Sequence, residues 1–117
     1  MPRVEFLWFD GCPNHERARA LLDDVIAAVA PGASVEVIDA SDPDVAVVHR
    51  FPGSPTIRVD GIDIDPGFID PADYTPRCRL FRTADGLRGV PPRAWIEDAL
   101  TKARSRTRSS ASGIIAR

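Results

Sequence analysis

Residues 4–15 of the chain read VEFLWFDGCPNH. Residues 4–9 are apolar or aromatic except for Glu5, which is typical of a central strand covered on both faces. From residue 13 to residue 30 apolar side chains recur at helical spacing, and a Pro-Gly pair follows them. The sequence therefore predicts a strand, a short turn and a helix, with Cys12 in the first helical turn.

The predicted position of Cys12 bears on its chemistry. A helix N-terminus presents unpaired N–H groups and the positive end of the helix dipole, and both stabilise a thiolate over a thiol. The thiolate is the nucleophilic form of cysteine. Cys12 is therefore the candidate catalytic residue of the chain.

Strands and helices alternate along the rest of the chain, which indicates an α/β fold. Residues 62–76 contain three prolines and several aspartates, so we expect an irregular insertion there, with room for a strand turn at its beginning. In the last predicted strand Cys78, Leu80 and Arg82 share one face, taken as the inward one. Further strands are predicted at 35–39, 56–59 and 77–82, a short helix after Asp42-Pro43, and a final helix at 92–103.

Length and charge predict one domain with a tail. The chain has 117 residues, of which 44% are hydrophobic and 27% charged, as in ordinary globular proteins. All 17 acidic residues lie at or before Asp98, so the end of the chain is basic. We expect a domain at 1–103 and a disordered basic tail at 104–117. We also expect a cytoplasmic protein with reduced thiols, because no apolar run is long enough for a membrane span and no signal peptide is apparent.

Three motifs in this order resemble the thioredoxin-like family over roughly residues 3–103. They are the apolar strand that leads into Gly11-Cys12-Pro13-Asn14-His15, the Gly53-Ser54-Pro55-Thr56 segment, and the Gly86–Pro91 segment before the last helix. The resemblance implies a thioredoxin-like fold, with a central mixed four-stranded sheet flanked by helices. It is strongest to small bacterial members of the family, some of which carry an organomercurial-lyase label.

The resemblance also implies roles for several residues. The residue that matches Cys12 attacks disulfides or other electrophilic sulfur, and the proline that matches Pro55 is cis and packs against it. Pro13, Ser54, Pro55 and Gly89 are then expected to contact a thiol or disulfide substrate, which is either a small molecule or a protein.

His15 departs from the family's pattern, in which a second cysteine stands three residues after the first. Without that cysteine, exchange within the motif is limited to monothiol chemistry, in which a small thiol such as glutathione resolves the mixed disulfide. Two interpretations of His15 stay open. Its imidazole activates Cys12 as a second catalytic residue, or it is a solvated residue of the first helical turn.

Cys78 also allows two interpretations, as a resolving thiol or as a small buried core residue. If 77–82 is a strand whose far end approaches the active-site edge, Cys78 begins about 13 Å from that edge, at ~3.3 Å per residue. A disulfide needs Cα atoms within about 7 Å. A direct bond to Cys12 therefore requires rearrangement, unless the insertion folds over the site as a lid and brings Cys78 closer.

Three function classes follow from these residues. The leading one is monothiol thiol–disulfide exchange through Cys12. The first alternative is a redox-silent binding module on the same fold. The second is mercury binding or organomercurial cleavage, which requires Cys12 and Cys78 to sit together. The sequence predicts no resident cofactor or metal, no specific nucleic-acid binding and no membrane partner, and it does not specify an oligomeric state.

Overall fold

A computed structural model describes residues 2–115, with side chains for residues 2–105. Within this range one mixed sheet has four strands in the order β2-β1-β3-β4. The central strand β1 runs parallel to β2 and antiparallel to β3, and β3 pairs with β4 through a tight turn at Asp60-Gly61. The predicted α/β class and the mixed four-stranded sheet are confirmed. The strands are β1 (Arg3–Trp8), β2 (Ser34–Asp39), β3 (Thr56–Val59) and β4 (Ile62–Asp63).

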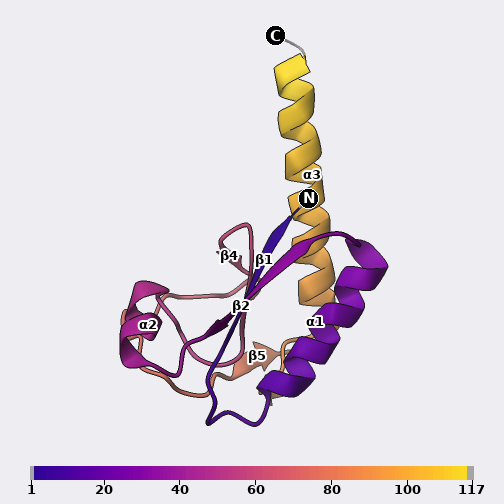
Figure 1. Cartoon of the computed structure of the whole chain (residues 1–117). Helices are drawn as coiled ribbons and strands as arrows, with labels where there is room; N and C mark the ends of the chain where they lie inside the picture. Colours follow the sequence, from indigo (N-terminus) through magenta and orange to yellow (C-terminus); the bar gives the residue numbers. More distant parts are fainter. Residues whose placement is uncertain (1, 116–117) are drawn as a thin grey trace.

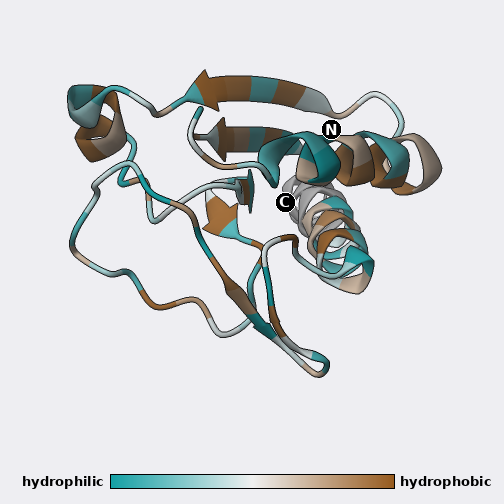
Figure 2. Cartoon of the chain, turned by 90° about the horizontal axis from the view of Figure 1, so that it is seen from below, coloured by the Kyte–Doolittle hydropathy of each residue, from teal (hydrophilic) through white to brown (hydrophobic). Residues whose placement is uncertain are grey.

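Helices pack on both faces of this sheet (Figures 1 and 2). On one face α1 (His15–Val29) and α3 (Arg93–Ile115) bury Val4 and Phe6 of β1. On the other face the short helix α2 (Pro43–Val48) contributes Ala46 to a smaller core around Leu7 and Phe51. Because β1 contributes to both cores, four of its six residues are apolar, namely Val4, Phe6, Leu7 and Trp8.

The end of the predicted sheet is different from the expectation. Residues 77–80 form no regular strand, and β5 (Phe81–Thr83) pairs with β6 (Gly86–Arg88) in a separate two-stranded hairpin. The buried side chains there are Arg79 and Phe81, whereas Cys78 and Leu80 are exposed. The predicted inward face of 77–82 is therefore wrong by one residue. The physical reason is a buried carboxylate partner for Arg79, described below.

Helix α3 continues to Ile115, so the helix boundary predicted at residue 103 is wrong, and residues 104–115 are helical. Residues 116 and 117 lie outside the described residues. Extending a helix that already exists requires no new nucleus, so residues 104–115 continue it although four serines and a glycine there favour helix less than its three arginines do. Arg104 still contacts the domain, where its Nη1 donates to the Val29 carbonyl at 2.7 Å. Beyond it the helix projects away from the sheet (Figure 1).

The long connection between β4 and β5 is irregular, as predicted for 62–76. It is fastened by side chains: the Asp70 carboxylate pairs with Arg50 at 2.6 Å and accepts from the Tyr74 hydroxyl at 2.8 Å. None of the helices within residues 2–115 is long and apolar enough to cross a membrane.

Candidate functional site

Cys12 lies in the turn between β1 and α1. Its N–H donates to the Phe9 carbonyl at 3.0 Å, and the first helical hydrogen bond runs from Ala18 N–H to the Asn14 carbonyl at 3.1 Å. The helix begins at His15, so the prediction that Cys12 occupies the first helical turn is wrong. The Phe9 bond closes a separate turn there and delays the start of the helix. Cys12 is only 1% exposed, and its thiol donates to the Ser54 carbonyl at 3.3 Å.

Ser54 joins three segments of the chain at the site. The Ser54–Pro55 peptide bond is cis, the conformation expected from the resemblance. The Ser54 N–H donates to the Arg77 carbonyl at 2.8 Å, and the Ser54 carbonyl accepts from the Arg79 N–H at 2.8 Å as well as from the Cys12 thiol. The Ser54 hydroxyl is buried and has no hydrogen-bond partner among the described residues. One residue therefore connects the turn that carries Cys12 with the segment 77–79.

Cys78 sits in that segment, opposite Ser54 in an isolated parallel bridge. Neighbouring strands are about 4.8 Å apart, so Cys78 is placed directly beside the loop that Cys12 contacts. The pKa of the Cys78 thiol is raised by its hydrogen bonding with Cys12, and further by partial burial and by the charge of Cys12. Both the separation of about 13 Å and the buried position predicted for Cys78 are wrong, because 77–80 is not the strand on which those estimates depended.

The contact between the two thiols has a measurable consequence for alkylation. In the reduced protein we expect Cys78 to react with iodoacetamide more slowly at pH 8 than an ordinary exposed thiol, because its raised pKa leaves less thiolate. Cys12→Ala removes the main cause of that shift, so the pKa of Cys78 falls back and the rate at pH 8 rises by about two- to tenfold. The pH–rate profile of the modified peptide measures this. Identical profiles with and without Cys12 would contradict the contact.

His15 faces Trp8. The two ring centroids are 4.7 Å apart, and both rings line a shallow open groove with Phe6 and Val37. Among the described residues His15 makes no hydrogen bond to Cys12. The structure therefore places the imidazole against the Trp8 ring. Activation of Cys12 by His15 stays a prediction.

Gly89 lies against the start of α1. A Cβ at this position would overlap the Asn14 side-chain amide, so any larger residue here would require the Asn14 side chain to move. Pro13 is exposed beside it. Two of the residues expected to contact substrate, Pro13 and Gly89, thus flank the Cys12 turn, and the other two form the Ser54–Pro55 loop.

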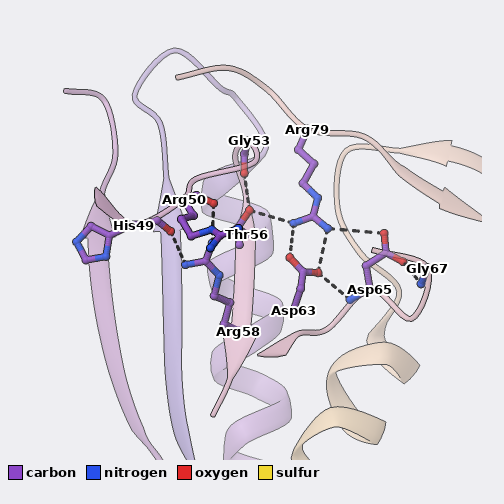
Figure 3. A network of polar contacts seen from close by, with 9 residues as sticks. All are labelled: His49, Arg50, Gly53, Thr56, Arg58, Asp63, Asp65, Gly67 and Arg79. Carbon is purple, nitrogen blue, oxygen red and sulfur yellow. Dashed lines mark hydrogen bonds and ion pairs between the residues drawn. The ribbon is translucent and has the colours of Figure 1, made fainter. Parts of the chain in front are cut away.

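A buried arginine beside the site is absent from the sequence-based predictions. Arg79 is 8% exposed and forms a two-pronged ion pair with Asp63, at 2.8 and 2.9 Å (Figure 3). Asp63 lies in β4, at the start of the predicted insertion, where the sequence allowed a strand turn. One feature of the sequence could have indicated that Arg79 is buried. In an extended segment Arg79 shares a face with the large apolar residue Phe81, whereas Cys78 and Leu80 lie on the opposite face.

The site thus consists of a buried thiol, an exposed thiol and a cis-proline loop that contacts the segments carrying both of them. In the part of the chain that the structure describes, no three side chains of the types His, Cys, Asp and Glu gather as a set of metal ligands. No model of a known protein family matches the chain, and no curated protein matches it.

Proposed function

We propose that this chain is a thioredoxin-like protein that carries out thiol–disulfide exchange with Cys12 and Cys78 as its redox pair. The single observation that carries the proposal is that both cysteines meet at Ser54, Cys12 through its thiol and Cys78 through the backbone bridge. The cis Ser54–Pro55 peptide at the same place agrees with the resemblance drawn from the sequence. Cys78 then supplies from another segment the second thiol that the Cys-Pro-Asn-His motif lacks.

Burial favours Cys78 as the sulfur that external groups reach. Cys12 is 1% exposed, whereas Cys78 is exposed, and thiol–disulfide exchange requires in-line access to the attacked sulfur. The sequence alone favoured Cys12 for this role. In the pair proposed here Cys12 is the inner thiol, which forms and breaks the internal disulfide.

The proposed reaction oxidises two substrate thiols. A substrate thiolate attacks the Cys78 sulfur, the Cys12–Cys78 bond breaks, and Cys12 leaves as a thiolate that takes up a proton. A second substrate thiolate attacks the substrate sulfur of the mixed disulfide and releases Cys78. The substrate gains one disulfide and the protein becomes a dithiol. The hydrogen bond from the Cys12 thiol to the Ser54 carbonyl can form only in the reduced protein and favours it, which makes the protein disulfide more oxidising.

The expected setting is a cytoplasm with glutathione as co-substrate, in which the protein exchanges with small or protein thiols. The backbone edge of the cis-proline loop is already paired with residues 77–79 through the Ser54 N–H and carbonyl, so the proposed substrate contacts are made by side chains and by the Cys78 sulfur. Pro13 and Gly89 lie next to the Cys12 turn and complete the proposed contact surface.

Intact mass after treatment with glutathione disulfide tests the proposal. The wild type should lose two hydrogens and keep no glutathione, because its two thiols become a disulfide while glutathione disulfide becomes two glutathione molecules. Cys12→Ala should retain one glutathione on Cys78. In Cys78→Ala, glutathione disulfide should modify Cys12 about tenfold more slowly than it modifies Cys78 in Cys12→Ala, because the Cys12 thiol is buried.

Three results would overturn parts of this proposal. If the wild type keeps one glutathione without forming an internal disulfide, the protein is monothiol, and if it does not react, it is a redox-silent binding module. If Cys78→Ala reacts faster than Cys12→Ala, Cys12 is the sulfur that meets the substrate, as the sequence favoured.

The same pair of thiols favours a second candidate function, the binding of a mercuric ion. A soft cation of this kind prefers thiolate ligands and needs few of them. We expect one equivalent of mercuric ion to protect both thiols of the wild type from a thiol reagent, and Cys78→Ala to release the ion to a competing dithiol at least about tenfold more readily. Equal release from both proteins would exclude a shared site.

A further inference from the structure

We infer that Arg79 is a positioning residue of the redox pair: its buried guanidinium holds the segment that carries Cys78 against the loop that contacts Cys12. This inference rests on the proposed function, because it concerns how the two thiols are brought together. Arg79 has no place in the exchange chemistry itself, since its guanidinium is engaged by Thr56 and Asp63 (Figure 3).

The segment 77–79 has little else to hold it. It belongs to no regular strand, and two backbone hydrogen bonds, both to Ser54, attach it to the loop. The side chains of Cys78, within the segment, and of Leu80, directly after it, are exposed and therefore bury little apolar surface. A long irregular connection precedes it and a hairpin follows it, and neither is part of the main sheet.

The Arg79 guanidinium makes several contacts to the main sheet. Both of its terminal nitrogens bind Asp63, Nη1 also donates to the Thr56 hydroxyl at 3.0 Å, and Nη2 lies 3.6 Å from an Asp65 carboxylate oxygen. Asp63 is itself only 4% exposed, so the pair is shielded from water and poorly screened. A fork of this kind fixes direction as well as distance.

Aromatic rings close the remaining sides of the guanidinium. Its central carbon lies 4.5 Å from the Phe81 ring centroid and 5.3 Å from that of Phe68. These contacts restrict the side chain further, because a planar guanidinium stacks on ring faces in a way that an ammonium group does not.

The same cluster also fixes the loop that contacts Cys12. The Thr56 hydroxyl, which accepts from Arg79, donates to the Gly53 carbonyl at 2.6 Å (Figure 3). Gly53 directly precedes Ser54. The buried Arg79 guanidinium therefore fixes both halves of the site. Arg79 is itself part of the segment that carries Cys78, and its hydrogen bond to Thr56 holds the Ser54 loop.

Preorganisation of this kind sets how readily two thiols form a disulfide. The equilibrium between the dithiol and glutathione gives an effective concentration of one thiol at the other, and this quantity falls when the thiols spend less time in contact. Loosening the Arg79 fork should therefore lower the effective concentration without changing either cysteine.

Arg79→Lys and Arg77→Lys make a matched pair of variants for this test. Both keep the charge and lie in the same segment, but Arg77 forms an exposed pair with Asp73. In glutathione redox buffers, at a temperature where each variant is folded by circular dichroism, we expect Arg79→Lys to lower the effective concentration about tenfold or more, because lysine cannot form the fork. Arg77→Lys should stay within about twofold of the wild type.

Amide hydrogen exchange gives a second readout that needs no redox chemistry. Residue 79 and Ser54 donate the two backbone bonds that hold the segment, so their amides should exchange faster in Arg79→Lys and not in Arg77→Lys. A charge-neutral variant, Asp63→Asn with Arg79→Met, removes the fork without leaving a buried unpaired charge, and it should also lower the effective concentration.

The outcomes separate the two proposals. A wild type that forms no Cys12–Cys78 disulfide contradicts the proposed function, and unchanged amide exchange then contradicts the positioning role as well. A wild type that forms the disulfide, with Arg79→Lys at the same effective concentration and the same amide exchange, contradicts the positioning role alone. A purely structural role would lower the melting temperature of Arg79→Lys and leave the effective concentration of the folded protein unchanged.

Discussion

Replacing Asp63 with alanine is expected to lower the free energy of unfolding by about 3–5 kcal/mol, because it leaves the Arg79 charge buried without its main partner. Arg79 and Asp63 are 8% and 4% exposed, so water cannot take over the lost interaction without opening the site. Urea denaturation at pH 7 measures the change.

Asp73→Ala is the control for this prediction. Asp73 pairs with Arg77 at 3.6 Å, but both side chains are exposed, so its loss should cost about 1 kcal/mol or less. If Asp63→Ala and Asp73→Ala lower the free energy of unfolding equally, solvent screens the Arg79–Asp63 pair as strongly as it screens an ion pair on the surface. Adding Arg79→Met to Asp63→Asn should recover part of the loss seen in Asp63→Ala, because no charge is then buried alone.

Gly53→Ala is expected to be the second strongly destabilising change, by about 2–6 kcal/mol, the sum of backbone strain and steric overlap at about 1–3 kcal/mol each. Gly53 has φ +137°, a conformation that L side chains rarely adopt. An added Cβ would lie 2.8 Å from the Arg79 Cβ and 3.3 Å from the Cys78 carbonyl oxygen. We therefore expect thermal denaturation to show a large loss, accompanied by weaker formation of the Cys12–Cys78 disulfide.

Gly61→Ala separates strain from overlap. Gly61 also has a positive φ, +82°, but nothing lies within 4 Å of an added Cβ. Its cost should be about 1–2 kcal/mol, from strain alone, with no effect on the disulfide. If both glycine variants lose the same stability and retain the disulfide, the close approach of Gly53 to Arg79 does not hold the site together.

Much of the fold could be predicted from local patterns. The apolar run of β1, the helical spacing of α1 and the Asp42-Pro43 start of α2 each reflect forces that act within a few residues. The Asp42 carboxylate does cap α2, accepting from the Asp44 N–H at 2.8 Å. Such patterns predict an element wherever burial and backbone hydrogen bonding agree with the sequence.

The segment around Cys78 could not be predicted in this way. Alternation in 77–82 predicts that apolar residues face inward, yet Arg79 is buried and Leu80 is 61% exposed. A charged side chain is buried only when a partner is already inside, and that partner, Asp63, lies 16 residues earlier in the chain. A single sequence contains no pattern that pairs the two, and the position of Cys78 depends on this pairing.

The candidate site was predicted in part for the same reason. Cys12 and the Ser54–Pro55 loop belong to short motifs, and the structure brings them into contact. The helical start expected around Cys12 shifted to His15 because of a single turn hydrogen bond from Cys12 to Phe9, whose geometry the sequence does not specify.

The Ser54 carbonyl accepts two donors, the thiol of Cys12 and the N–H of Arg79. A Cys12 sulfur that is bonded to another sulfur has no proton to donate, so this oxygen would then be left with the Arg79 N–H alone. The backbone bond that holds the Cys78 segment would no longer compete for the oxygen, and it would strengthen at the moment when the two sulfurs are joined. The Cys12–Cys78 disulfide and the hydrogen bond from the Arg79 N–H to the Ser54 carbonyl would then strengthen each other. Oxidation of Cys12 would in this way change the backbone hydrogen bonding of residues 77–79, which are distant from it in sequence.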